Sequence, residues 1–302
     1  MKKDLPQKPD SNSGPRKDPL LLGAHFSIAK GLHIALFEAQ SYGCRALQLF
    51  TKNANTWRER TLADEEIVRF KAAVSETGIK AIASHTSYLI NLAADDREKH
   101  TRSCHALAQE LLRSSQLNIP FVVLHPGSHM GRGPAAGIRR IAESVNEIFA
   151  GNPGISTRLL FETTAGQGAS VGHTFEQLAA IREMINPRYR IGFCLDSSHI
   201  FAAGYDIRSK AAYRKTMAAF EAAIGLKHLY IIHLNDSKKD LGSRVDRHEH
   251  IGEGLIGIRA FELFMNDDRL AHIPKIIETP KQKNGQDADR VNLDTLRSLR
   301  HA

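Results

Sequence analysis

Residues 158–200 read RLLFETTAGQGASVGHTFEQLAAIREMINPRYRIGFCLDSSHI. The runs at 158–164 and 191–197 are nearly continuous in Leu, Ile and Phe, which is typical of parallel strands buried on both faces. Residues 173–184 between them have the spacing of an amphipathic helix. The stretch therefore predicts a strand–helix–strand unit, and its two strands end in acidic residues, Glu162 and Asp196.

The same unit recurs along the chain. We predict eight strands, at residues 21–27, 46–51, 80–86, 121–127, 158–164, 191–197, 228–234 and 274–280. A segment with helical spacing follows each strand, at residues 31–42, 64–77, 95–116, 134–150, 173–184, 209–224, 258–265 and 287–299. This alternation indicates an α/β fold, and the count favours a (β/α)8 TIM barrel. We expect residues 20–302 to form one barrel domain and the polar residues 1–19 to form a flexible tail.

Composition and charge favour a globular protein without disulfide bonds or membrane spans. The chain has 302 residues, 42% hydrophobic and 25% charged, which is enough to bury a core without disulfide bonds. Its three cysteines are an odd number without close spacing, which favours a reducing compartment. No run of about 18 apolar residues occurs, so we expect no membrane span. The net charge of +8 suits a partner with a phosphate backbone.

Metal-type side chains end six of the predicted strands. They are His85, His125, Glu162, Asp196, His233 and Glu278. An aliphatic strand has no packing reason to end in imidazole or carboxylate, whereas active sites of (β/α)8 barrels lie at the carboxyl ends of the strands. These side chains are therefore expected to converge on one polar site.

Three further residues extend this set. His199 follows Asp196 by three positions, where the strand breaks into its loop. Asp246 and His248 alternate around Arg247, so an extended loop points both of them to one side. Nine ligands are too many for one ion and fit two or three metals that share a carboxylate. Histidines and carboxylates suit zinc or manganese. Clustered metals of this kind hydrolyse phosphate esters.

At these residues the sequence resembles the endonuclease IV family of apurinic/apyrimidinic (AP) endonucleases. The matching stretches are GAHFS, LFTKN, HTSYLINL, LHPGSH, ETTAGQG, LDSSHIFAAGYD, HLNDSK, GSRVDRHEHIGEG and IIETP. They extend from about Leu21 to about Pro280, and HTSYLINL and GSRVDRHEHIGEG are the most specific. The resemblance implies a TIM-barrel deoxyribonuclease IV of base excision repair. Such an enzyme cuts double-stranded DNA on the 5′ side of abasic sites, leaves a 3′-hydroxyl, and removes blocked 3′ ends.

The resemblance also implies a set of ligands and roles. About three Zn²⁺ ions are expected per chain, with Mn²⁺ acceptable at one site. One ion would be held by His85, His125 and Glu162. A second would be held by Glu162, Asp196, His233 and Glu278, and a third by His199, Asp246 and His248. Glu162 and Glu278 are the expected catalytic residues, around a hydroxide that bridges two of the metals. The enzyme is expected to be a cytoplasmic monomer that acts on the bacterial nucleoid.

Candidate DNA contacts lie beside the predicted site. They are Lys52, Asn53, Asn55, Tyr88, Arg244 and Arg247. Tyr88 follows the His85 strand end and could insert beside an extruded nucleotide. The loop TKNANTW departs from the family at Asn55, where bacterial relatives often carry a longer, charged Arg that fills the gap in the duplex.

Two other functions compete with the nuclease. A metal-dependent sugar isomerase or epimerase on the same barrel would need only Glu162, Asp196, His233 and Glu278. It would not need His85, His125 or the Asp246–His248 loop, so these extra residues favour the nuclease. A DNA-binding or zinc-holding protein without turnover is the second alternative, and the complete ligand set argues against it.

Overall fold

The computed structural model describes residues 20–301 and contains a closed barrel of eight parallel strands. The strands are β1 (Leu22–His25), β2 (Ala46–Leu49), β3 (Ala81–His85), β4 (Phe121–Leu124), β5 (Arg158–Glu162), β6 (Ile191–Asp196), β7 (Leu229–His233) and β10 (Lys275–Ile277). Each strand pairs with its neighbour in the chain, and β1 closes the ring by pairing with β10. The predicted TIM barrel is confirmed. The predicted tail, residues 1–19, lies outside the described residues.

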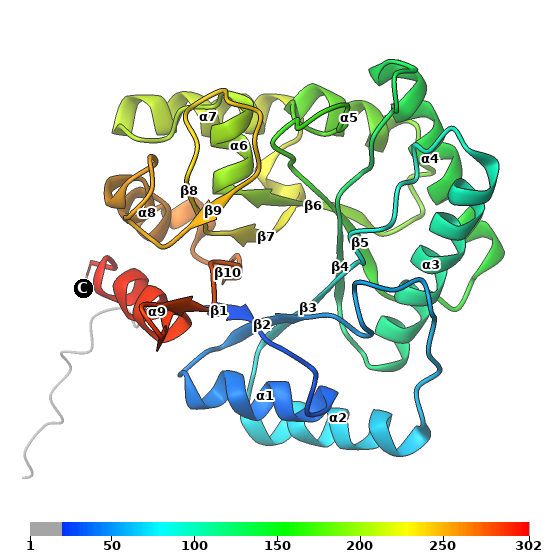
Figure 1. Cartoon of the computed structure of the whole chain (residues 1–302), viewed down its shortest axis with the longest axis horizontal. Coiled ribbons are helices and arrows are strands. Elements are labelled where there is room, and N and C mark those ends of the chain that lie inside the picture. Colours follow the sequence, from blue (N-terminus) through cyan, green and yellow to red (C-terminus); the bar gives the residue numbers. More distant parts are fainter. Residues whose placement is uncertain (1–19, 302) are drawn as a thin grey trace, which may run out of the picture.

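Eight helices surround the strands in the order that the sequence predicted (Figure 1). They are α1 (Leu32–Ser41), α2 (Asp64–Thr77), α3 (Arg97–Gln116), α4 (Pro134–Gly151), α5 (Phe175–Glu183), α7 (Lys210–Ala223), α8 (Ile258–Met265) and α9 (Ala288–Ser298). Short polar side chains start several of them: Asp96 accepts from the Lys99 N–H at α3, and Thr174 accepts from the Gln177 N–H at α5. None of the helices within residues 20–301 is long and apolar enough to cross a membrane.

Several short elements were not predicted. Helix α6 (Ser197–Ala203) begins directly after β6. Two small hairpins lie outside the barrel: β8 (Asp236–Ser237) pairs with β9 (His248–Glu249), and β11 (Gln282–Lys283) pairs with β12 (Gln286–Asp287). Single 3₁₀ turns occur at Leu226–His228 and Asp268–Leu270. These elements are too short to produce a periodic apolar pattern, which is why the sequence does not reveal them.

Small and aliphatic side chains fill the inside of the barrel. This inner cluster consists of Ala46, Ala81, Ala83, Val123, Leu160, Cys194, Ile231 and Ile276, whereas the larger core lies between strands and helices. Side chains alternate along a strand, so the residue two positions after an inner one also points inward. That rule places polar residues next to the inner cluster, on its carboxyl-terminal side. His85 follows Ala83 by two positions, and Glu162 follows Leu160 by two positions. The chain thus builds a polar layer at the carboxyl end of the barrel.

Candidate metal centre

The six metal-type residues at strand ends all reach this polar layer. Glu162 stands at its centre and is fully buried. Its Oε2 lies 3.1 Å from His85 Nε2 and 2.9 Å from His125 Nε2. Its Oε1 lies 2.8 Å from His233 Nδ1. Because its two oxygens face different histidines, the Glu162 carboxylate has the geometry of a ligand that two metals can share. His85, His125 and Glu162 are the first group.

A second group lies on the Oε1 side of Glu162. The ligand atoms of Glu162, Asp196, His233 and Glu278 all lie within 4.8 Å of one another. His233 Nδ1 is 3.2 Å from Glu278 Oε2 and 3.9 Å from Asp196 Oδ2. Three carboxylates and one imidazole therefore face a common point, as in an oxygen-rich zinc or manganese site. Buried Cys194 also comes within 4.8 Å of Glu162 and His233.

The third group, His199, Asp246 and His248, is assembled from two segments. His199 lies in the first turn of α6, where its N–H donates to Asp196 Oδ1 at 2.8 Å. Its Nε2 is 3.1 Å from Asp246 Oδ2, and His248 Nε2 is 3.4 Å from Asp246 Oδ1. Asp196 Oδ2 lies 3.8 Å from His248 Nε2, so this group adjoins the second one. The structure thus brings together all nine residues that the sequence singled out.

Two of the imidazoles are oriented as metal-binding histidines usually are, with one nitrogen on an acceptor and the other toward the ligand cluster. Nδ1 of His85 faces the Thr86 carbonyl at 2.8 Å, which leaves Nε2 for Glu162. Nδ1 of His199 faces the Thr163 carbonyl at 2.8 Å, which leaves Nε2 for Asp246. The donor set and its orientation therefore fit a metal cluster.

One buried nitrogen tests this fit directly. His248 Nε2 is inaccessible to solvent and has no hydrogen-bond partner. A buried polar atom without a partner is costly, by roughly 1–3 kcal/mol. The nitrogen faces the Asp246 and Asp196 carboxylates across 3.4 and 3.8 Å. A cation between them would take its lone pair and balance the two negative charges.

Burial and the neighbouring opposite charges have opposing effects on the ionisable groups of this layer. Burial disfavours the charged form of His199, yet the Asp196 and Asp246 carboxylates raise its pKa well above the usual range. Burial likewise opposes ionisation of Glu162, but His233 and His125 hold its pKa well below the usual range. Protons on the histidines thus offset the carboxylate charges, and a metal has to displace these protons to bind.

Two amides that sequence reasoning missed hold the ligands in place. Gln48 donates to Glu278 Oε1 at 2.5 Å, and its Oε1 lies 2.9 Å from His233 Nε2. Asn235 donates to Asp196 Oδ2 at 2.6 Å and accepts the Glu278 N–H at 2.7 Å. A signal for Gln48 was available: it stands two positions after Ala46, on the inward side of an otherwise apolar strand.

An open pocket of about 360 Å³ lies over the ligand cluster. Its walls include Tyr88 and Arg247 as well as ligands from all three groups. Tyr88 is 69% exposed, so it is not packed into the core of its loop. Asn53, Asn55 and Arg244 are exposed as well. These five candidates lie on the surface, where a large ligand can reach them.

Lys52 is not exposed, although the sequence predicted that it contacts a phosphate. Its side chain is buried, and the ammonium donates to the Thr56 carbonyl at 2.5 Å and lies 3.6 Å from Glu59. An internal carboxylate already neutralises this charge. In this structure Lys52 therefore shapes its loop, while Asn53 and Asn55 form the exposed tip.

A buried ionic network anchors the same loop, residues 51–60, to α3. Arg113 stands at its centre, and its guanidinium donates to Thr51 Oγ1 at 2.9 Å, Glu59 Oε2 at 2.5 Å and Glu110 Oε2 at 2.8 Å. Thr51 Oγ1 also donates to Glu110 at 2.7 Å. Because every partner belongs either to the loop or to α3, the network sets the position of the loop tip.

Arg113→Met is expected to destabilise the protein by about 3–5 kcal/mol, because it removes the guanidinium from the buried carboxylate of Glu110 and from the partly buried carboxylate of Glu59. Urea unfolding measures the loss. Arg102→Met is the matched control, since the Arg102 side chain is 57% exposed and has its one ion pair within residues 20–301 with Glu98, and it should cost about 0–1 kcal/mol. Equal effects of the two substitutions would show that the network is not a structural anchor.

Comparisons with known proteins show which proteins this chain is similar to. The AP endonuclease 2 family model, described as a xylose isomerase-like TIM barrel, matches residues 36–300. "Probable endonuclease 4" of Chloroflexus aggregans is 48% identical over 277 residues, which cover 92% of this chain and 96% of that protein. Endonuclease IV from Thermus thermophilus superposes with a TM-score of 0.82 at 36% identity, and the match covers 93% of this chain and 98% of that one.

Sugar epimerases share the barrel but not the sequence. D-psicose 3-epimerase from Clostridium cellulolyticum superposes with a TM-score of 0.67 at 14% identity, and the match covers 93% of this chain and 99% of that one. A likeness at this level of identity shows a common fold and nothing about a common substrate.

Proposed function

This chain belongs to the endonuclease IV family, and we propose that it is a zinc-dependent AP endonuclease of base excision repair. In this proposal it hydrolyses the phosphodiester on the 5′ side of abasic sites in double-stranded DNA, leaves a 3′-hydroxyl, and removes blocked 3′ ends. Its place of action is the bacterial cytoplasm, where it meets the nucleoid as a monomer.

The proposal is carried by the contacts of Glu162. Its carboxylate faces the second group through Oε1 and the two extra histidines, His85 and His125, through Oε2. A sugar epimerase would need only the second group. Two adjoining groups that share Glu162, with a third beside them, instead suit a phosphate that several cations touch at once.

The groups have distinct roles in this proposal. The first group would hold one Zn²⁺, the second group another, and the third group a further Zn²⁺, with Mn²⁺ acceptable at one of these sites. When bound, the clustered ions supply a hydroxide nucleophile at neutral pH and offset the charge that develops on the scissile phosphate. The Glu162 carboxylate belongs to both of the first two groups and contributes one oxygen to each.

The protein's own residues position the substrate and the protons. Glu278, whose Oε1 is held by Gln48, would accept the proton of the attacking water in this proposal. Exposed Tyr88, at the wall of the pocket, covers the extruded nucleotide. Arg247 and Arg244 contact phosphates, and Asn53 and Asn55 approach the duplex from the anchored loop. The short Asn55 reaches less far into the duplex than an arginine would.

A duplex with one tetrahydrofuran abasic analogue tests the proposed function. The analogue cannot undergo β-elimination, so any cut on its 5′ side is hydrolytic. We expect one incision that leaves a 3′-hydroxyl, by protein that carries about three zinc ions per chain. Folded, zinc-loaded protein that fails to cut this duplex but epimerises ketoses would refute the nuclease.

A further inference from the structure

Asp236 is a fully buried carboxylate outside the ligand cluster, and it is surrounded by backbone N–H groups. Its Oδ1 accepts from the N–H groups of Ser237 and Ile256 at 2.8 and 3.0 Å. Its Oδ2 accepts from the N–H groups of Gly252 and Gly257 at 3.0 and 3.3 Å. Four backbone donors from both ends of one loop thus converge on one side chain, which lies shortly after β7.

The loop closed in this way is residues 238–257, and it carries Asp246 and His248 of the third group. Its two arms pair beside Asp236: the Lys238 N–H donates to the Arg247 carbonyl at 2.9 Å, and the Leu255 N–H donates to the Ser237 carbonyl at 2.8 Å. Ser237 also pairs with His248 in the β8–β9 hairpin. A few backbone hydrogen bonds therefore link Asp236 to the segment that carries the third group.

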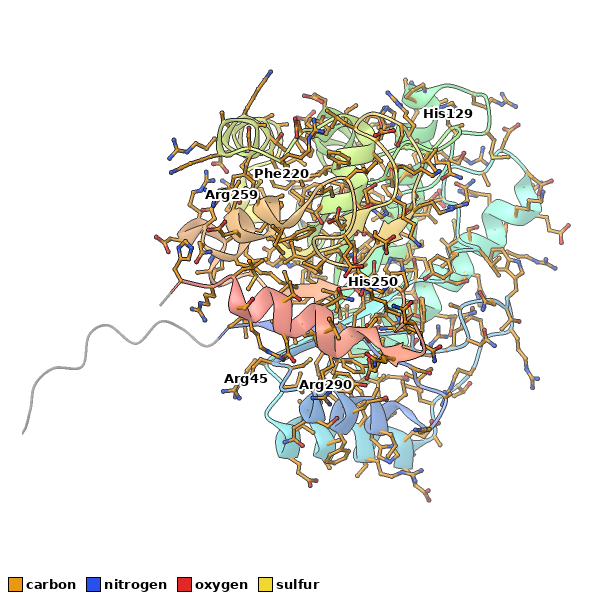
Figure 2. All side chains as sticks on the ribbon, turned by 60° about the vertical axis from the view of Figure 1, so that its left-hand side comes forward. Arg45, His129, Phe220, His250, Arg259 and Arg290 are labelled. Atoms are coloured by element: carbon orange, nitrogen blue, oxygen red, sulfur yellow. The ribbon has the colours of Figure 1, made fainter. Side chains whose placement is uncertain are left out.

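A second attachment joins the same loop to α9. Asn292 Oδ1 accepts the Ile251 N–H at 2.9 Å, and its Nδ2 lies 3.1 Å from His250 Nδ1. Figure 2 shows His250 directly beside this helix. The loop is thus held at its outer side by α9, whereas Asp236 holds it at the end of the barrel strand.

Gly254 shows how closely the loop wraps around the carboxylate. A Cβ atom added at this position would lie 2.4 Å from Asp236 Oδ1 and 2.5 Å from the Ser237 carbonyl oxygen. Neither atom can move away, because one is held by the surrounding N–H groups and the other by the Leu255 N–H. Even a methyl group at residue 254 would push the loop off Asp236.

We propose that Asp236 is the positioning residue of the third group, which it assembles by holding Asp246 and His248 against His199. The first two groups depend on strand ends, so they do not require this loop. The inference rests on the proposed function only for the identity of the ion in the third group.

The test compares Asp236→Asn and Gly254→Ala with Asp267→Asn in the full chain. Asp267 also accepts from a backbone N–H and a hydroxyl, at Arg269 and Tyr213, but it follows α8 at the opposite end of the barrel. Each protein is loaded with zinc and dialysed against a series of chelators of increasing affinity for zinc. The zinc content is then measured by mass spectrometry.

Wild type and Asp267→Asn should retain about three zinc ions. Asp236→Asn and Gly254→Ala should lose one ion at about 10–100-fold lower chelator strength and retain the other two. Wild-type retention of all ions in both loop variants would overturn the proposal, as would parallel loss of all ions. Gly254→Ala decides the case if Asp236→Asn does not fold. Failure of the wild type to cut the abasic duplex would refute the nuclease without affecting this zinc count.

Discussion

Glu162→Gln is expected to reduce incision of abasic DNA on the order of 1000-fold or more while the barrel still folds. The substitution keeps the shape of a fully buried side chain, so it leaves no cavity. It removes the negative charge that faces His85, His125 and His233 and replaces one acceptor oxygen by an NH₂ group. An amide cannot serve two metal groups as a carboxylate can.

The measurement is single-turnover incision of the tetrahydrofuran duplex, with the zinc content of each sample determined beforehand. Glu262→Gln is the matched control, because Glu262 pairs with His301 at 3.1 Å and with Arg259, away from the ligand cluster. Its rate should equal that of the wild type, and circular dichroism should show the same fold in all three proteins. Substantial turnover by Glu162→Gln with its full metal content would contradict the sharing of this carboxylate.

Removal of the metals is the second change with a large expected effect. Chelation should abolish incision and lower the melting temperature, and added zinc should restore both. Ligand linkage gives about 4 kcal/mol of stability for each site that is filled at about 1,000 times its dissociation constant. Without cations the negative charges of the Glu162 and Glu278 carboxylates repel each other in a buried layer. Protons on the neighbouring histidines partly offset these charges.

The effect of chelation should also depend on pH. Burial lowers the pKa of His199 and His233, but neighbouring acidic groups outweigh it and raise both pKa values well above the usual 6.5. Their protonation therefore stabilises the metal-free protein fully below pH 6.5, and this contribution is lost as the pH rises through the folded pKa. The pKa values of the Glu162 and Glu278 carboxyls are instead held below the usual 4.5. Their contribution to stability is therefore fully present above pH 4.5 and does not change as the pH rises further.

Thermal unfolding between about pH 6 and 9, with zinc and with a chelator, measures this difference. We expect the stability difference between zinc-loaded and metal-free protein to widen as the pH rises. A Glu262→Gln sample should follow the wild-type curves. A melting temperature that is unaffected by chelation, in protein shown to have lost its zinc, would rule out a structural contribution of metals to this layer.

The sequence predicted the barrel because its signals are local. Each strand is a short, nearly continuous apolar run, and each helix has its own apolar period. Some helices also begin at a polar capping residue, such as Asp96 at α3. Strand alternation then explains why His85 and Glu162 point inward, since each follows an inner residue by two positions. Gln48 obeys the same rule and could have been predicted, whereas Asn235 has no such pattern. The metal roles of the nine residues stay predictions.

The sequence by itself determined which side chains end the strands, because that depends only on neighbouring residues. Tertiary structure decided what those side chains meet. Asp246 of the loop 238–257 meets His199 of α6, and Glu59, which lies 3.6 Å from the ammonium of Lys52, is held by Arg113 of α3. The contacts of Asp246 with His199 and of Glu59 with Arg113 join residues far apart in the chain, so they exist only after the barrel closes and fixes the positions from which its loops start.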